Sequence, residues 1–148
     1  MKVGIANDHA ATEMKFALMK YLQDKGYEVV NYGFDTTESV DYPIAGEKLA
    51  MGVRNGEVER GIAICGTGVG ISLACNKVNG IRAGVCSETK TAGLIREHNN
   101  AQIVAFGARI VDLDTAKAIV DTFLTTPFSN GERHIKRLNM LIEIEERN

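Results

Sequence analysis

The sequence contains no tryptophan, two prolines and three cysteines in 148 residues. The odd number of cysteines and the lack of CxxC spacing argue against a disulfide framework and against a zinc site. We therefore expect free thiols, and we interpret Cys75 and Cys86, which fall on an expected helix and at a strand end, as core residues. His9, His98 and His134 are scattered without a carboxylate at ligand spacing, so no metal or other cofactor is expected.

An excess of one charge and a long apolar run are also missing. Seventeen basic and nineteen acidic residues give a formal net charge of -2, so we expect no binding to nucleic acid or to an anionic membrane. No stretch is long enough to cross a bilayer, and Met1–Asp8 runs into a strand pattern without the apolar core of a signal peptide. The sequence thus predicts a cytoplasmic protein whose 148 residues form a single domain, residues 1–148.

Short runs rich in β-branched residues alternate with helical periodicity, which is typical of a parallel sheet covered by helices on both faces. The sequence predicts a three-layer α/β/α sandwich, with a five-stranded parallel Rossmann-like sheet and an extra C-terminal helix that is free to pack on a partner. The expected strands are Lys2–Asn7, Tyr27–Tyr32, Gly61–Cys65, Arg82–Cys86 and Ile103–Phe106. The expected helices are Glu13–Lys25, Pro43–Asn55, Gly70–Lys77, Thr89–His98, Asp114–Leu124 and Glu132–Glu145. The apolar stripe expected on the first helix is Phe16, Ala17, Met19, Tyr21 and Leu22.

The most informative stretch is Ile62-Ala63-Ile64-Cys65-Gly66-Thr67-Gly68-Val69-Gly70-Ile71. It would place Cys65 at the carboxyl end of a buried strand, where open α/β sheets bind ligands, and three alternating glycines at the start of a helix. Bare backbone N–H groups beside the positive end of a helix stabilise an anion, and the same field favours the thiolate of Cys65. One alternative is that Cys65 is only a small buried hydrophobe. A dinucleotide loop is the other, but G-x-G-x-x-G fails in both registers because Ile71 or Leu73 takes the third glycine position.

Two polar clusters are candidates to complete a site around Cys65. Asn7-Asp8-His9 follows the first strand, whose carboxyl end can lie beside the third-strand loop. The alternative is that Asp8 only caps the first helix. Glu97-His98-Asn99-Asn100 offers an imidazole that exchanges protons near neutral pH, against the alternative of a solvated helix end.

A third cluster is basic. Arg133 and Arg137 stand one helical turn apart and would share a face. With Arg109 they would form a phosphate clamp, since the planar guanidinium suits that anion. The alternative is a solvated basic face.

Together these residues resemble the type B ribose-5-phosphate isomerases, whose family includes the galactose-6-phosphate isomerase subunits. The resemblance implies an aldose–ketose isomerase, an intramolecular oxidoreductase of the pentose phosphate pathway that interconverts ribose 5-phosphate and ribulose 5-phosphate. It extends over essentially the whole chain, in Asp8-His9, Asp41-Tyr42-Pro43, Ile64–Ile71, Asn76-Lys77, Gly80-Ile81-Arg82, Glu97-His98-Asn99 and Gly107-x-Arg109.

The resemblance also implies the roles of the residues. Cys65 would carry the proton between C1 and C2, and His98, helped by Asp8, would open the furanose ring. The enediolate would be stabilised by Thr67, Gly66, Gly68 and Gly70, and the substrate would be bound by Asn99 at the sugar and by His9, Arg109, Arg133 and Arg137 at the phosphate. His98, Asn99 and Arg109 would come from a neighbouring subunit, so that a homodimer or homotetramer, secured by the last helix, would share its active sites.

Departures from the family pattern leave the substrate open. The approach to Arg133 is one residue longer than the usual Gly-Gly-Arg-His, Gly33–Glu38 differs from the common Gly-Thr pattern, and Asn7 replaces a small residue. An isomerase of a six-carbon sugar phosphate, such as galactose 6-phosphate or allose 6-phosphate, is the alternative enzyme. A non-catalytic phosphosugar-binding module is the alternative of another class.

Overall fold

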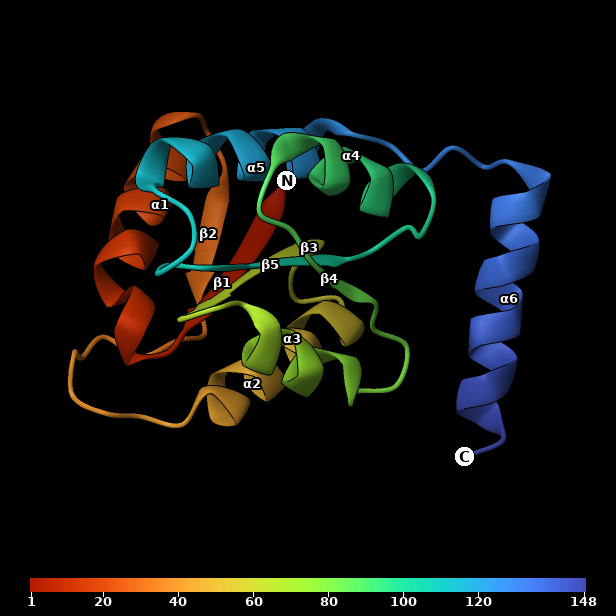
Figure 1. The fold of residues 1–148 in the computed structure, drawn as a ribbon, viewed down its shortest axis with the longest axis horizontal. Coiled ribbons are helices and arrows are strands. Elements are labelled where there is room, and N and C mark those ends of the chain that lie inside the picture. The colour runs from red at the N-terminus through yellow and green to blue at the C-terminus, as the bar shows by residue number, and fades with distance from the viewer.

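A computed structural model describes residues 1–148 and shows a five-stranded parallel sheet in the order β2-β1-β3-β5-β4, with helices on both faces (Figure 1). This confirms the predicted α/β fold. The central strands β1, β3 and β5 lie within a residue of their expected positions, whereas the edge strands β2 and β4 are shorter than expected. The strands are β1 (Lys2–Asn7), β2 (Glu28–Asn31), β3 (Arg60–Cys65), β4 (Ala83–Val85) and β5 (Ile103–Gly107).

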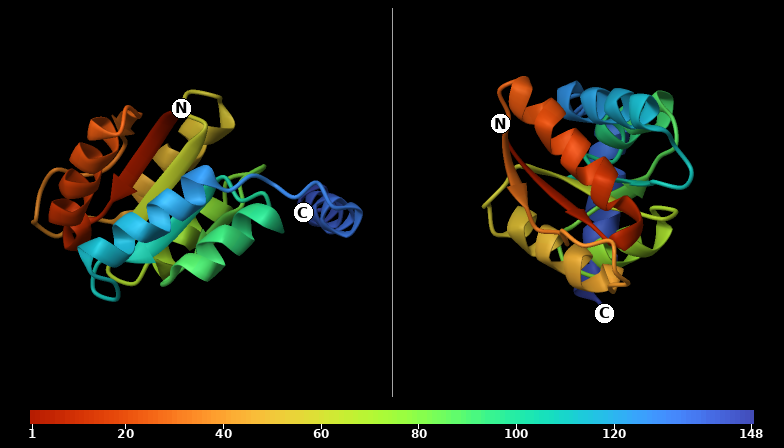
Figure 2. Two further views of the ribbon diagram at one scale, coloured as in Figure 1. Left: turned by 90° about the horizontal axis from the view of Figure 1, so that it is seen from above. Right: turned by 90° about the vertical axis from the view of Figure 1, so that its left-hand side faces the viewer.

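The two faces of the sheet are covered by different helices. α1, α4 and α5 pack over one face around an 18-residue core, and α2 and α3 cover the other around a 12-residue core (Figure 1 and Figure 2). None of the helices is long and apolar enough to cross a membrane. The helices are α1 (Thr12–Asp24), α2 (Tyr42–Arg54), α3 (Val69–Asn76), α4 (Thr89–Glu97), α5 (Leu113–Thr125) and α6 (Glu132–Glu146), and a short 3-10 turn, η1 (His9–Ala11), precedes α1.

Side chains of β3 alternate between the two cores, as strand geometry requires. Ile62 and Ile64 lie in the core under α1, α4 and α5, whereas Ala63 and Cys65 lie in the core under α2 and α3. The thiol of Cys65 is therefore on the α2–α3 side of the sheet, at the carboxyl end of its strand.

The buried stripe of α1 differs from the one expected. Phe16 is exposed, whereas Lys15 is completely buried together with Leu18 and Leu22. The Lys15 ammonium donates to the carbonyl oxygen of Phe34 at 2.7 Å and pairs with the carboxylate of Asp35. Because these acceptors come from a loop distant in sequence, helical periodicity could not predict the burial of this lysine.

Helix α6 lies beside the end of the sheet, apart from the two helical layers (Figure 1 and Figure 2). Of its fifteen residues only His134 and Leu138 are buried. One contact with the rest of the chain is the hydrogen bond from the Gly80 N–H to the Glu145 carboxylate, at 2.9 Å. Five apolar side chains of the helix are exposed, namely Ile135, Met140, Leu141, Ile142 and Ile144.

Candidate active site

Strand β3 ends at Cys65, whose sulfur accepts a hydrogen bond from the backbone N–H of Gly68 at 3.1 Å. Gly68 is also the N-cap of α3, with a φ of 83°. The thiol therefore lies against the glycine loop, at the positive end of a helix dipole, although it is almost completely buried. The other two cysteines differ: burial raises the pKa of both Cys75 and Cys86 to about 12, as suits inert core thiols.

The glycine loop is packed on three sides. A Cβ on Gly68 would lie 2.6 Å from the Phe106 carbonyl carbon of β5, and one on Gly70 would lie 2.7 Å from the Tyr42 ring. On the third side, a Cβ on Gly66 would lie 3.1 Å from a guanidinium nitrogen of Arg109. The sequence reasoning named Tyr42 only as part of the Asp-Tyr-Pro motif, and the structure places its ring directly on the loop.

Thr67 points to solvent at the tip of this loop. Its hydroxyl oxygen accepts from the N–H of Val69 at 3.2 Å, which leaves the hydroxyl hydrogen free to donate. The loop thus offers one side-chain donor beside the backbone N–H groups at the start of α3.

Asp8 and His9 lie beside the end of β3, as the sequence predicted. The Asp8 N–H donates to the Ile64 carbonyl oxygen at 3.2 Å, which continues the β1–β3 pairing to the residue next to Cys65. The Asp8 carboxylate accepts a hydrogen bond from the Ala10 N–H at 3.0 Å and caps η1. The predicted capping role of Asp8 is therefore present in the single chain. His9 accepts the Val40 N–H at Nδ1, at 3.1 Å. In the neutral ring Nε2 then carries the hydrogen and can donate it to an anion.

Arg109 reaches the loop from within the same chain. Its backbone N–H donates to the Gly66 carbonyl oxygen at 3.1 Å, and the Ala108 N–H donates to the Cys65 carbonyl oxygen at 2.8 Å. The resemblance implied that Arg109 comes from a neighbouring subunit. Within the single chain its guanidinium lies at Gly66, because β5 pairs with β3 and both strands end on the same side of the sheet.

His98 and Asn99 lie near the amino-terminal ends of the strands, opposite the carboxyl ends where Cys65 lies. They follow α4 and precede β5, whereas Cys65 pairs with Gly107 at the other end of β5. A five-residue strand spans about 13 Å at about 3.3 Å per residue. One chain therefore does not bring His98 and Cys65 together.

Around His98 the chain gathers a second polar cluster. The rings of His98 and His134 are 4.5 Å apart between centroids, and the Ser129 hydroxyl is 2.7 Å from Nδ1 of His134. Arg133 donates to Nε2 of His134 at 3.3 Å. Burial lowers the pKa of His134, and the nearby charges of His98, Arg133 and Arg137 lower it further. The sequence reasoning did not single out His134 and Ser129, because their partners depend on how the 126–131 segment folds.

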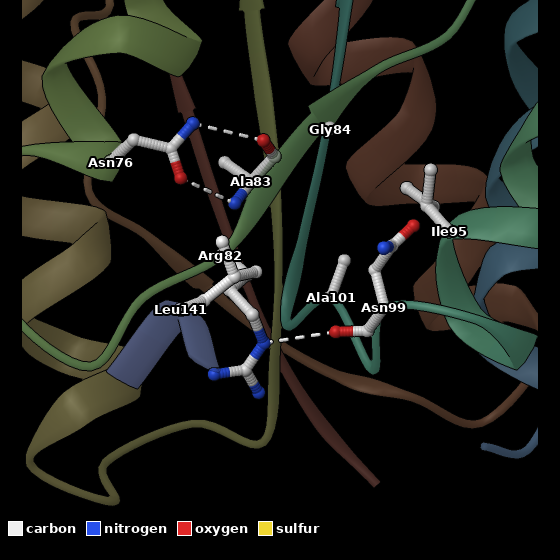
Figure 3. Close-up of a pocket in the computed structure, with 8 residues that line it drawn as sticks. All are labelled: Asn76, Arg82, Ala83, Gly84, Ile95, Asn99, Ala101 and Leu141. Carbon is white, nitrogen blue, oxygen red and sulfur yellow. Dashed lines mark hydrogen bonds between the residues drawn. The ribbon is translucent and has the colours of Figure 1, made fainter. Parts of the chain in front are cut away.

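Asn99 borders a cavity of about 230 Å³ between the start of β4, the turn before β5 and α6 (Figure 3). The candidate site residues thus form two separate groups within the chain, which are named here the cysteine half-site and the histidine half-site. The cysteine half-site contains Asp8, His9, the loop from Cys65 to Gly70, and Arg109. The histidine half-site contains His98, Asn99, Arg133, His134 and Arg137.

The glycine loop follows β3, which neighbours β1 in the sheet, and the chain leaves these two strands toward opposite faces. Open α/β sheets bind their ligands at such a place, so the fold defines an α/β protein of the ligand-binding type. The sequence comparison specifies the class, since residues 3–141 match the model of the Ribose/Galactose Isomerase family. The chain belongs to this family and is, as the resemblance implied, an aldose–ketose isomerase of sugar phosphates.

Individual relatives cover almost the full chain. Ribose-5-phosphate isomerase B of Escherichia coli is 44% identical over 146 residues, which is 99% of this chain and 97% of that protein. A D-erythrulose-4-phosphate isomerase of Pectobacterium atrosepticum is 41% identical over 132 residues, 88% of this chain and 87% of the relative.

Solved structures agree with this assignment. Ribose-5-phosphate isomerase B of Clostridium thermocellum superposes with a TM-score of 0.97 at 50% identity and covers 99% of both chains. The Mycoplasma genitalium enzyme, solved with bound ribulose-5-phosphate, superposes with a TM-score of 0.93 at 36% identity, over 99% of this chain and 97% of the other.

Proposed function

We propose that the protein interconverts ribose 5-phosphate and ribulose 5-phosphate, with Cys65 as the base. The observation that supports this most directly is the contact between the Cys65 sulfur and the Gly68 N–H. In the open-chain aldose, the thiolate removes the proton from C2, and the C1 carbonyl oxygen takes up the negative charge of the enediolate. Transfer of the O2 proton to O1 and return of the abstracted proton to C1 yield the ketone at C2 and a hydroxyl group at C1. No electron leaves the substrate, so the reaction needs no redox cofactor.

The glycine loop would hold the enediolate oxygen. The Gly68 N–H lies against the Cys65 thiol, and the Thr67 hydroxyl belongs to the same short loop, near which the charge would develop. A single donor of this kind typically contributes about 2.7–4 kcal/mol to transition-state stabilisation. The phosphate would be bound by Nε2 of His9 with Arg109, Arg133 and Arg137, and the hydroxyl groups of the sugar by Asn99.

A second copy of the chain would complete the active site. His98, which we propose opens the furanose ring with help from Asp8, lies at the end of the strands opposite Cys65. The exposed apolar side chains of α6 offer a surface for association. We therefore propose a homodimer with shared sites as the smallest active unit, with a homotetramer as the larger alternative, and the pentose phosphate pathway in the cytoplasm as its setting.

The base is tested with Cys65→Ala beside Cys75→Ala. Both cysteines lie in the α2–α3 core, but only Cys65 contacts the glycine loop. Loss of a general base typically lowers turnover about 10²–10⁴-fold. Cys65→Ala should show a loss of this size in kcat for ribose 5-phosphate, and Cys75→Ala should not. Undiminished turnover in Cys65→Ala would remove this thiol from the mechanism.

Shared sites are tested by mixing Cys65→Ala with His98→Asn, each strongly impaired alone but with a residual turnover that can be measured. Subunit exchange produces mixed dimers in which one of the two sites combines an intact Cys65 with an intact His98. Activity should recover on mixing, toward one quarter of the wild-type value at full exchange. If both residues act within one chain, mixing restores nothing.

The length of the substrate is the second question. One relative acts on a four-carbon sugar phosphate by its name. In this chain the longer approach to Arg133 is accommodated by a turn with Asn130 at a φ of 58°. A panel of four-, five- and six-carbon sugar phosphates, including galactose 6-phosphate and allose 6-phosphate, compared by kcat/KM, identifies the preferred length. Exchange of solvent deuterium into bound sugar phosphate would exclude a non-catalytic binding module.

A further inference from the structure

We propose that Arg96 and Arg82 are positioning residues that hold the 98–101 turn, and with it the His98 imidazole, in the geometry needed for ring opening. The inference rests on the proposed role of His98 and adds two residues to it. Neither arginine lies in the cysteine half-site, and neither would touch the reacting carbons.

Arg96 is a buried cation whose hydrogen-bond partners are all neutral. Only 3% of its surface is exposed. Its Nη1 donates to the Asn100 side-chain oxygen at 2.9 Å and to the Ala101 carbonyl oxygen at 2.8 Å. Burial, together with the charges of Arg60 and Arg82, lowers the pKa of Arg96 to about 10, so it stays protonated at neutral pH. A buried charge without an opposite charge is costly, and here its hydrogen bonds hold the turn that follows His98.

Arg82 binds the same turn from the side of β4. Its Nε donates to the Asn99 carbonyl oxygen at 2.9 Å, and Nη2 donates to the Asn100 carbonyl oxygen at 3.1 Å; Figure 3 shows the first of these bonds. The carbonyl groups of Asn99, Asn100 and Ala101 are thus all bound by the two guanidinium groups. Asn100 adopts a left-handed conformation, with a φ of 45°, which an asparagine tolerates best when its side chain is held.

Arg96 also fixes the segment that carries the partner of His98. Its Nε donates to the Thr126 carbonyl oxygen at 3.1 Å, just before the 127–131 segment. In that segment the Ser129 N–H binds the Glu97 carbonyl oxygen at 3.2 Å, and its hydroxyl binds His134. Both His98 and His134, whose rings are neighbours, are therefore linked to Arg96 through the segments that carry or contact them.

The chain offers a matched control in Arg60. The guanidinium carbons of Arg60 and Arg96 lie 5.8 and 5.9 Å from the centroid of the Phe123 ring, so both pack on the same aromatic side chain. Arg60 donates to the Phe123 carbonyl oxygen at 3.4 Å and makes no hydrogen bond to the 98–101 turn. A role in packing alone would thus be shared by the two arginines, whereas positioning of His98 belongs to Arg96.

The experiment separates ring opening from proton transfer. In ribulose 5-phosphate the C5 hydroxyl is esterified, so this ketose forms no furanose and has no ring to open. Exchange of solvent deuterium into its C1 position therefore reports the Cys65 step alone, whereas turnover of ribose 5-phosphate also needs ring opening. Both rates are measured for wild type, Arg96→Lys, Arg82→Gln and Arg60→Lys.

A misplacement of about 1 Å can lower a rate about 10²-fold. We expect Arg96→Lys to lower ribose 5-phosphate turnover by that order and to leave deuterium exchange into ribulose 5-phosphate almost unchanged. Arg82 is more exposed than Arg96, so Arg82→Gln is expected to fold, and it should show the same selective loss of ribose 5-phosphate turnover. If Arg96→Lys does not fold, the Arg82 variant alone tests the positioning role. Arg60→Lys should preserve both rates. In a His98→Asn background, Arg96→Lys should cause no further loss of ribose 5-phosphate turnover.

Three results would overturn the inference: an equal loss of both rates in the folded Arg96 and Arg82 variants, wild-type turnover in both, or the same selective loss in Arg60→Lys. Failure of the proposed function is recognised separately, in the wild type. There it would appear as the absence of both turnover and exchange.

Discussion

The backbone N–H of Gly68 points at the sulfur of Cys65, three residues before it, at 3.1 Å. This contact joins the end of β3 to the start of α3 and needs the left-handed conformation of Gly68. The hydrogen bond directs a backbone donor at a sulfur atom that solvent hardly reaches. Its geometry makes several properties of the protein testable.

Gly68→Ala should disrupt the loop, whereas Gly56→Ala should not disturb the site. Both glycines have a positive φ, 83° and 77°, but a Cβ on Gly68 would collide with β5 while one on Gly56 meets nothing within 4 Å. Gly56→Ala should cost about 1–2 kcal/mol of stability from backbone strain alone. Gly68→Ala should cost more and should also abolish turnover. Urea unfolding and kcat measure the two effects, and equal losses in the two variants would contradict this account of the loop.

Thr67→Val should lower kcat about 10²–10³-fold, because it removes the side-chain donor from the glycine loop. Thr67 is exposed, so the change should hardly affect the free energy of unfolding. Thr67→Ser keeps the hydroxyl and serves as the control, with activity near that of wild type. A Thr67→Val enzyme as active as Thr67→Ser would show that the hydroxyl does not hold the enediolate.

The Lys15–Asp35 pair should make stability depend on pH in the acid range. The hydrogen bond from Lys15, and then that from Asn31, lowers the pKa of Asp35. A lowered carboxyl pKa stabilises the fold above the unfolded value of about 3.9, and this stabilisation disappears as the pH falls through the lower folded value. Asp35→Asn should therefore be less stable than wild type near neutral pH, and the difference should shrink in acid.

Urea unfolding across this pH range measures the contribution of the pair. In a Lys15→Met background, Asp35→Asn should change the stability much less, because the ammonium that favours the carboxylate is gone. A difference that stays constant with pH would mean that the pair does not shift the titration of Asp35.

His134 should titrate below an ordinary histidine. Its pKa is lowered by burial and by the charges of His98, Arg133 and Arg137. At pH values below the unfolded pKa of about 6.5, the unfolded chain binds the proton more readily than the folded chain. The free energy of unfolding therefore decreases as the pH is lowered, until the pH passes below the folded pKa. NMR titration of the ring should show the lowered pKa, and His98→Asn should raise it. A His134 pKa above 6.5 in the wild type would contradict the arrangement of the two rings.

The sequence was sufficient for the central strands and for the position of Cys65. β1, β3 and β5 are buried on both faces, so their hydrophobic runs are nearly continuous and end where the strands end. The glycines after Cys65 predicted the helix start for the same local reason, since backbone geometry and helix capping involve neighbouring residues. The edge strands β2 and β4 were predicted less accurately, because each has a single neighbouring strand and only three or four residues.

Contacts between distant segments were decided by the tertiary structure. The burial of Lys15 depends on Asp35 and Phe34, and the position of Arg109 on Gly66 depends on the β3–β5 pairing. No local pattern contains these partners, because each interaction joins residues 19 or more positions apart through packing. The sequence was enough to recognise His98 as part of a family motif. Only the sheet shows that His98 and Cys65 lie at opposite ends of the strands in a single chain.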